Sequence, residues 1–218
     1  KEYQTRVNSE LADILGNFVN RALVLTNKYY DGSVPETTEY TAEDKTLLKE
    51  ISQIPDRISK LIYDYKLREA QSEAMNLARL GNRYLAETEP WKLIKDEANA
   101  GRVQTIMNIA LQICANLSIV LKPFLPATAE KIGGFLNYDS SEWSEAGTLD
   151  LLKAGHQINT PTILFQKIED ELVEKEVEKL NAAKEDTMEE ATFVPQKAEA
   201  TFDDFMKMDI RLGKILTA

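Results

Sequence analysis

Residues 98–121 read ANAGRVQTIMNIALQICANLSIVL, and this stretch decides the fold of the chain. It is the most apolar helix-forming segment of the sequence, and a helix that is apolar over most of its surface belongs in a core. Its large aliphatic residues are Val103, Ile106, Ile109, Leu111, Ile113, Leu117 and Val120. We therefore expect it to be the central helix of a bundle, with Cys114 as a small core residue rather than a nucleophile.

The sequence before this segment predicts further helices from its apolar periodicity. They are expected over residues 9–29, 43–65 and 66–87. Asn8 is a candidate N-cap for the first of them, and Thr41 with Asp44 has the spacing of a capping box for the second. Pro90 and Trp91 follow the third helix in a short connection that we expect to be non-helical. The sequence thus predicts an all-α fold.

The sequence after the central segment is less regular. A short helix is expected over 127–136, then a long loop, and then a charged helix over 168–183. Residues 187–201 lack periodicity and contain Pro195, which is typical of a linker. The last residues begin to resemble a short helix followed by a β-strand.

These patterns predict four parts along the chain. Residues 1–137 would form the helical bundle, and residues 138–184 would form a return loop and a charged helix packed on it. Residues 185–200 would be a linker, and residues 201–218 the truncated start of a further domain. Because the sequence starts with KEYQ and carries no initiator Met, we expect it to be part of a longer chain.

Composition narrows the classes of function. The chain has 218 residues, of which 43% are hydrophobic and 28% charged, so it has enough apolar material for a core. With one Cys and one His it can form neither an internal disulfide nor a four-thiol metal site, and a mechanism that needs two histidines is excluded. No apolar run approaches the roughly 18 to 20 residues of a membrane span. We expect a cytoplasmic protein with no membrane partner.

The net charge of -10 at first argues against nucleic acid, because phosphate binding depends on Lys and Arg. The charge is unevenly distributed, however. Residues 1–136 contain 17 Lys and Arg against 18 Asp and Glu, whereas residues 137–218 contain 9 against 18. The acidity therefore belongs to the second part, and an RNA partner remains open for the first.

A search for catalytic motifs returns almost nothing. The sequence has no phosphate-binding GxxxxGK[ST] or GxGxxG loop, no GxSxG and no HExxH, and Gly133-Gly134 is too short to be a phosphate loop. We predict no catalytic residue and no metal site within this chain.

The polar edge of the first helix gives a stronger signal. At 100° per residue, Glu10, Asn17, Arg21 and Lys28 fall within about 40° of one another. An amide and a guanidinium at i and i+4 suit a nucleobase, because the amide offers a donor and an acceptor and the guanidinium offers parallel donors or a flat face. The alternative is an ordinary solvated helix face. Trp91 has two interpretations as well, the edge of a core or a platform for stacking a base.

Four blocks of the sequence resemble the helical anticodon-binding domain of the methionyl-tRNA synthetase family, in the same order and with the same separation. The blocks are VNSELADILGNFVNRALVLTNKYYDGSVP (7–35), IYDYKLREAQSEAMNLARLGNRYLAETEPWKL (62–93), LKPFLPATAEKIGGFLN (121–137) and ILFQKIEDE (163–171). The resemblance covers about residues 1–175, and FDDFMKMDIRLGKIL (202–216) resembles the opening of an appended oligonucleotide-binding barrel. It implies a helical bundle of the class I synthetase anticodon-binding type.

The resemblance also implies site residues. Asn17 and Arg21 match the pair on the first helix that contacts the anticodon in this family, and Trp91 after Pro90 matches the aromatic residue that stacks on an anticodon base. The adenylate-forming signatures HIGH and KMSKS are missing from this sequence. The catalytic domain would then lie upstream, and we expect the present fragment to be inactive by itself.

The function implied for the parent enzyme is the ATP-dependent attachment of methionine to its tRNA, with this part recognising the CAU anticodon. The implied partners are methionine tRNA and the upstream catalytic domain. ATP with magnesium would belong to the parent and not to this fragment. The resemblance leaves open a zinc site in the catalytic half and a homodimer of the parent through the barrel domain.

Two alternatives come from other classes of protein. One is the anticodon-binding bundle of a different class I synthetase, and the other is a helical protein-interaction scaffold with an acidic tail. The loop at 155–165 also has two interpretations. By resemblance it would return along the bundle toward the catalytic domain, and otherwise it would only pack on the surface.

Overall fold

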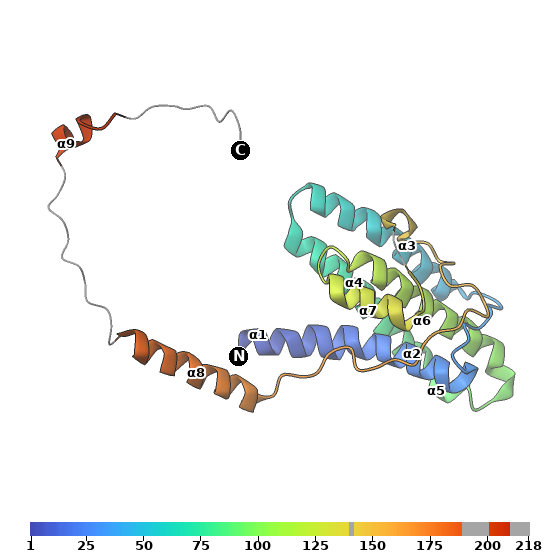
Figure 1. The fold of residues 1–218 in the computed structure, drawn as a ribbon. Coiled ribbons are helices and arrows are strands. Elements are labelled where there is room, and N and C mark those ends of the chain that lie inside the picture. Colours follow the sequence, from blue (N-terminus) through green and yellow to red (C-terminus); the bar gives the residue numbers. More distant parts are fainter. Residues whose placement is uncertain (140–141, 189–200, 210–218) are drawn as a thin grey trace. The chain divides into compact units, whose positions relative to one another are not determined.

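The computed structural model describes residues 1–139, 142–188 and 201–209 (Figure 1). Their contacts divide the chain into two compact units, Lys1–Val173 and Glu174–Ala218. In the described residues the first unit is a bundle of helices with one isolated β-bridge. The predicted all-α bundle is therefore confirmed.

The first three helical elements follow one another without a break. They are α1 (Glu2–Arg6), a π-helical segment (Val7–Gly16) and α2 (Asn17–Tyr30). The helix thus begins at Glu2, and the prediction that Asn8 caps its start was wrong. The Asn8 side chain instead pairs with the backbone of Ile168, accepting from its N–H at 2.8 Å and donating to its carbonyl at 3.0 Å. Sequence periodicity could not find this partner, which is 160 residues away.

Helices α3 (Ala42–Tyr63) and α4 (Leu67–Thr88) form the next pair and pack against each other. The predicted capping box is confirmed, since the Asp44 N–H donates to the Thr41 hydroxyl at 3.2 Å and the Thr41 N–H donates to the Asp44 carboxylate at 3.0 Å. Such a box satisfies two backbone donors that a helix start leaves unpaired.

Helix α4 approaches α2 closely because of one glycine. A Cβ atom at Gly81 would lie 2.3 Å from two ring atoms of Phe18, which is closer than real Cβ contacts allow. Phe18 is fully buried. The missing side chain at Gly81 therefore makes the space for the ring that joins the two helices.

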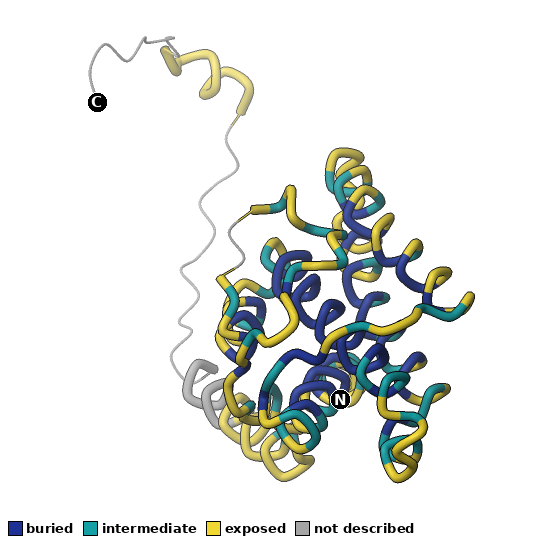
Figure 2. Tube along the Cα trace, turned by 90° about the vertical axis from the view of Figure 1, so that its right-hand side faces the viewer, coloured by how far each residue is buried: buried dark blue, intermediate teal, exposed yellow. Residues whose placement is uncertain are grey.

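The central helix is α6 (Ala100–Val120), as the sequence predicts. Every residue from Thr105 to Leu121 is buried, and Figure 2 shows that the buried segments gather inside the bundle. The buried set includes three amides spaced four residues apart, Asn108, Gln112 and Asn116. Buried polar groups must find hydrogen-bond partners, and these three find some of them outside their own helix.

Besides hydrogen bonds within α6, the three amides bind backbone groups of neighbouring loops. Asn108 donates to the carbonyl of Pro35 at 2.8 Å, and Asn116 binds the 147–148 turn. Gln112 donates to the Leu152 carbonyl at 2.7 Å and accepts from the same residue's N–H at 3.2 Å. The central helix thus also fixes the paths of loops that have no regular structure.

The central helix has the length and composition of a membrane span as well. An 18-residue window within Glu97–Val120 reaches a mean hydropathy of 1.5, and 94% of that window is buried inside the bundle. Amides at Asn108, Gln112 and Asn116 interrupt the stretch, so it is no continuous apolar run, although its mean hydropathy meets the criterion. The burial accounts for the composition, since the core helix of a bundle meets the same criterion.

Three shorter elements accompany α6: α5 (Pro90–Leu93) and a 3-10 turn (Glu97–Asn99) before it, and α7 (Pro126–Phe135) after it. A further 3-10 turn, Trp143–Glu145, follows in the long loop. The predicted helix over 127–136 is confirmed to within one residue.

The loop after residue 154 runs back along the first helix. It starts beside the end of α2, where Ile158 N–H donates to the Gly32 carbonyl at 2.8 Å and a bridge joins Ser33 to Gln157. It continues past α7, where Lys131 binds the Ile163 carbonyl, and it reaches Asn8 at Ile168. The segment therefore returns along the bundle, as the resemblance implies.

Helix α8 (Asp170–Met188) is the predicted charged helix, and α9 (Phe202–Met206) opens on a capping box of Thr201 and Asp204. Most of the predicted linker and the predicted β-strand lie at 189–200 and 210–218, outside the described residues. The division into four domains, including the packing of the charged helix on the bundle and the start of a barrel, stays a prediction.

Candidate nucleic-acid interface

The candidate interface lies where α2 meets α5 (Figure 1). Asn17 is the first residue of α2 and is exposed, and its side chain has no hydrogen-bond partner in the described part of the chain. Arg21 follows one turn later and is half-buried. Its guanidinium carbon lies 4.7 Å from the centroid of the Trp91 ring. Two of the predicted site residues, 70 positions apart in the sequence, are therefore in direct contact.

Trp91 owes its position to the backbone around it. Helix α4 ends at Glu89 in the left-handed conformation, with φ of 43°, and Pro90 then starts α5. Proline is favoured at the first position of a helix because its φ is already helical and its missing N–H is not needed there. The prediction of a non-helical connection was therefore wrong, and Trp91 sits on a one-turn helix. Pro90 is buried, and Trp91 is half-buried against the core.

The rest of the predicted polar edge separates in the structure. Glu10 forms an ion pair with Arg79 of α4, so it joins two helices instead of extending the site. Lys28 is exposed and lies 5.4 Å from the ring of Tyr29. Of the four residues on the predicted polar edge, only Asn17 and Arg21 therefore remain at the candidate interface.

The three side chains offer complementary chemistry to a flat polar ligand. The Asn17 amide presents one donor and one acceptor group to solvent. Arg21 forms no salt bridge with any described carboxylate, so its five donors remain available. Trp91 presents an aromatic face, which is at present covered by the guanidinium in a cation–π contact.

A buried charge cluster joins the two ends of the segment that carries Trp91, and no sequence pattern predicted it. The Asp44 carboxylate is fully buried and forms an ion pair with Arg102 of α6. The second guanidinium nitrogen of Arg102 donates to Asp44 Oδ1 at 3.0 Å, and the Tyr84 hydroxyl of α4 donates to the same oxygen at 2.7 Å. An Arg within the most apolar helix was the one sequence signal that could have pointed to it.

The cluster shifts the pKa values of its members. Burial by itself would raise the pKa of the Asp44 carboxyl, but the hydrogen bonds from Arg102, Tyr84 and Thr41 together hold it below its ordinary value. Burial and the hydrogen bond to Asp44 raise the pKa of the Tyr84 phenol. Asp44 is therefore a carboxylate and Tyr84 a neutral donor at neutral pH, as their hydrogen bonds require.

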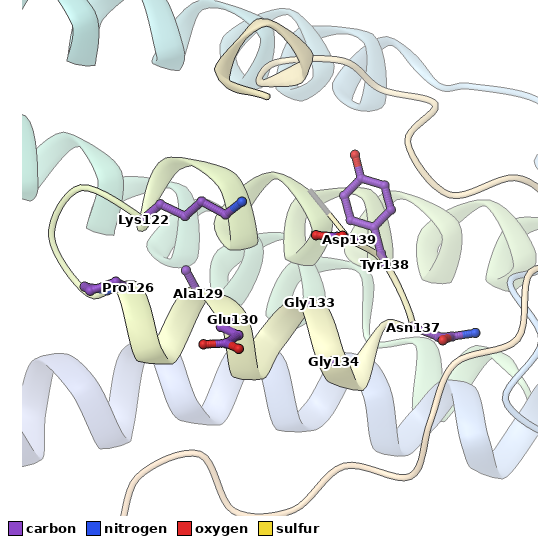
Figure 3. A pocket seen from close by; sticks show the side chains of 9 residues that line it. All are labelled: Lys122, Pro126, Ala129, Glu130, Gly133, Gly134, Asn137, Tyr138 and Asp139. Atoms are coloured by element: carbon purple, nitrogen blue, oxygen red, sulfur yellow. The ribbon is translucent and has the colours of Figure 1, made fainter. Parts of the chain in front are cut away.

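A separate pocket of about 640 Å³ lies beside α7 (Figure 3). Its lining residues are Lys122, Pro126, Ala129, Glu130, Gly133, Gly134, Asn137, Tyr138 and Asp139. None of the predicted site residues is among them. The Tyr138 hydroxyl donates to Glu145, and burial together with this hydrogen bond raises the pKa of Tyr138 to about 12. The phenol is thus protonated at neutral pH and is no general base.

The structure gives the remaining reactive residues ordinary surroundings. Cys114 is fully buried in the core, and burial raises the pKa of its thiol, which agrees with the predicted packing role. The ring of His156 binds the carbonyl of Leu136 at 2.7 Å. Among the described residues no three His, Cys, Asp or Glu side chains form a group that could hold a metal ion.

Comparisons with known proteins point to one family. The family model described as the anticodon binding domain of methionyl tRNA ligase matches residues 34–185. This match includes Pro90 and Trp91, whereas Asn17 and Arg21 precede it.

Curated relatives match nearly the whole chain. The methionine–tRNA ligase of Bacteroides fragilis strain YCH46 is 52% identical over 218 residues, which is 99% of this chain and 32% of the relative. That of Christiangramia forsetii is 50% identical over 226 residues, 100% of this chain and again 32% of the relative. The chain thus spans about a third of the length of these relatives.

Solved structures share the fold. The apo form of Mycobacterium tuberculosis methionyl-tRNA synthetase superposes with a TM-score of 0.69 at 24% identity, covering 76% of this chain and 34% of that one. The same enzyme in complex with methionyl-adenylate gives a TM-score of 0.67 at 25% identity, covering 74% and 32%.

Proposed function

This chain belongs to the methionyl-tRNA ligase family as its anticodon-binding domain, and on that premise we propose that it recognises the CAU anticodon of methionine tRNA through Asn17, Arg21 and Trp91. The observation that carries the proposal is the contact between Arg21 and Trp91, with the free Asn17 amide one turn away on the same helix. Proteins read RNA sequence mainly in loops, where bases leave the stack and meet aromatic faces and hydrogen-bonding groups.

Each residue would have a distinct role. Trp91 would stack on one anticodon base, and Asn17 would bind the edge of a base. The 4.7 Å between the Arg21 guanidinium and the Trp91 ring leaves no room for a base between them. Arg21 would therefore swing away when a base stacks, and its donors would then face the RNA. Pro90 is buried, so its contribution would be to hold the backbone of α5 rather than to touch a base.

The chemistry would lie in the other two-thirds of the parent enzyme. We infer that the parent joins methionine to tRNA with ATP and magnesium in the cytoplasm, and that this chain contributes recognition alone. On its own it should therefore support no exchange of pyrophosphate with ATP above background. Exchange by this chain would place catalytic residues within it.

Replacement of Trp91 separates recognition from folding. In the full-length enzyme, Trp91→Ala should lower aminoacylation by the equivalent of about 1 to 3 kcal/mol, which is the typical value of one stacked base. The pyrophosphate exchange that reports adenylate formation should be unchanged, because the substitution lies in a different domain.

Trp143→Ala is the matched control, since Trp143 is also half-buried against the bundle. It lies on the 3-10 turn Trp143–Glu145, and its Nε1 donates to the Ser59 hydroxyl. It should leave the anticodon dependence of aminoacylation intact. If Trp91→Ala lowered both reactions together, Trp91 would be a folding residue and the proposal would be wrong.

A further inference from the structure

The segment that carries Trp91 is tied to the rest of the bundle mainly at its two ends. Apart from the regular helical bonds of α4 and α6, the hydrogen bonds of the described residues 89–99 all end on residues between Leu85 and Asn99. Apart from packing, the one side-chain contact that leaves the segment is the cation–π contact of Trp91 itself. Apart from the packing of Pro90 and Trp91 on the core, the segment is therefore held where it begins and where it ends.

Both ends are fixed by the same carboxylate. Tyr84 is the single tyrosine of α4 and precedes the segment, and Arg102 is the first charged residue of α6 after it. Both donate to Asp44, which belongs to neither helix but to the first turn of α3. The Asp44 side chain thus joins the two ends of the stretch of chain that contains α5.

Asp44 and the two side chains that donate to it, Tyr84 and Arg102, form the Asp44 clasp, and its geometry is rigid. The Arg102 guanidinium binds both oxygens of Asp44, and such two-point pairs fix orientation as well as distance. The backbone N–H of Thr41 donates to the second oxygen, so the carboxylate cannot rotate without losing a bond. Asp44 is 0% exposed, and water cannot replace a lost partner there.

We propose that Asp44 is a positioning residue for the anticodon site: by holding Tyr84 and Arg102 it keeps Trp91 in contact with Arg21 and in register with Asn17. This inference rests on the proposed function only where RNA is concerned. The effect on Trp91 and Arg21 belongs to the protein alone and can be measured without RNA.

The first experiment follows Trp91 by fluorescence. The chain has two tryptophans, so Trp143→Phe makes Trp91 the sole emitter. In that background, Arg21→Ala uncovers the ring and sets the upper limit for acrylamide quenching. Asp44→Asn and Tyr84→Phe should both raise the quenching constant toward that limit, because the ring loses its fixed relation to the guanidinium.

Two choices keep this experiment interpretable. Tyr84→Phe removes only the phenol oxygen and leaves the ion pair, so it reports on the clasp even if Asp44→Asn does not fold. Thr41→Ala is the matched control, since it removes the hydroxyl of the capping box beside Asp44 and leaves Tyr84 and Arg102 bound. It should lower thermal stability without changing the quenching of Trp91. Equal quenching in Tyr84→Phe and Thr41→Ala would overturn the proposal.

The second experiment uses the full-length enzyme. Tyr84→Phe should raise the KM for methionine tRNA about tenfold, within the roughly hundredfold cost that small misplacements can carry. The kcat and the rate of adenylate formation should stay the same. A merely structural loss would lower active enzyme in both reactions and would therefore lower kcat.

The outcomes separate the two proposals. If Trp91→Ala does not affect recognition of tRNA, the proposed function is wrong, and the quenching result alone decides whether Asp44 positions Trp91. If Trp91→Ala does impair recognition while Tyr84→Phe and Asp44→Asn leave the KM for tRNA unchanged, Asp44 is not a positioning residue.

Discussion

One face of α2 buries Phe18, Ala22 and Leu23 completely, whereas the opposite face exposes Asn17 and leaves Arg21 half-buried over Trp91. The inner face has its partners within the bundle, and the outer face presents polar groups that no described carboxylate or backbone group occupies. The inner face therefore contributes stability, and we expect the outer face to contribute recognition.

The largest effect should come from the inner face. Phe18→Ala removes the ring that fills the space beside Gly81. Because no other side chain takes the place of the ring, a cavity remains. We expect a loss of about 3 to 5 kcal/mol in the free energy of unfolding, measured by urea denaturation followed by circular dichroism. Val24→Ala is the control on the outer face, where the side chain is 43% exposed, and should change stability by less than about 0.5 kcal/mol. Similar losses in both variants would remove the distinction between the faces.

A second prediction concerns recognition without stability. Asn17→Ala should leave the free energy of unfolding within about 0.5 kcal/mol of the original chain, because the side chain is exposed. In the full-length enzyme it should cost roughly 1 to 3 kcal/mol in binding of methionine tRNA, and much less for a tRNA already altered at the base that Asn17 reads.

The control for Asn17 is the same substitution at Asn20, an exposed asparagine on the same helix. Asn20→Ala should change neither stability nor the preference for the CAU anticodon. Should the two variants bind cognate and altered tRNAs equally well, the outer face of α2 would be an ordinary solvated surface.

The smallest net effect should come from Arg21→Ala, because two consequences oppose each other. The variant loses the donors of the guanidinium, but it also uncovers the Trp91 ring for stacking. If Arg21 meets phosphate, affinity should fall about equally for all anticodons and the salt dependence should decrease by about one unit. If it reads a base, the variant should behave like Asn17→Ala.

A salt titration of tRNA binding against cognate and altered anticodons distinguishes these cases. Lys28→Ala, near the other end of α2, is the charge-matched control. An identical change of slope in both variants would mean that Arg21 acts only through its general charge.

The helices could be predicted because their signals are local. The capping box of Thr41 and Asp44 and the periodicity of the central segment both depend on neighbours within a few residues. Two of the errors occurred where a side chain binds a partner far away in the sequence. Asn8 looked like a cap because it precedes an apolar repeat, but its amide binds Ile168. Glu10 belonged to the polar edge on a helical wheel, but Arg79 pairs with it.

The sequence by itself determined that this chain is a helical bundle around residues 100–120, and its motifs pointed to Asn17, Arg21 and Trp91. The bundle follows from apolar periodicity and the pairing of Asn17 with Arg21 from spacing along one helix, which are properties of neighbouring residues. The role of these two residues and of Trp91 came from the family resemblance. Only the tertiary structure decided that Arg21 covers Trp91 and that Asp44 binds Tyr84 and Arg102, which lie on either side of the segment that carries Trp91. Both are contacts between residues 40 to 70 positions apart, and such contacts depend on how helices pack rather than on what any one helix contains.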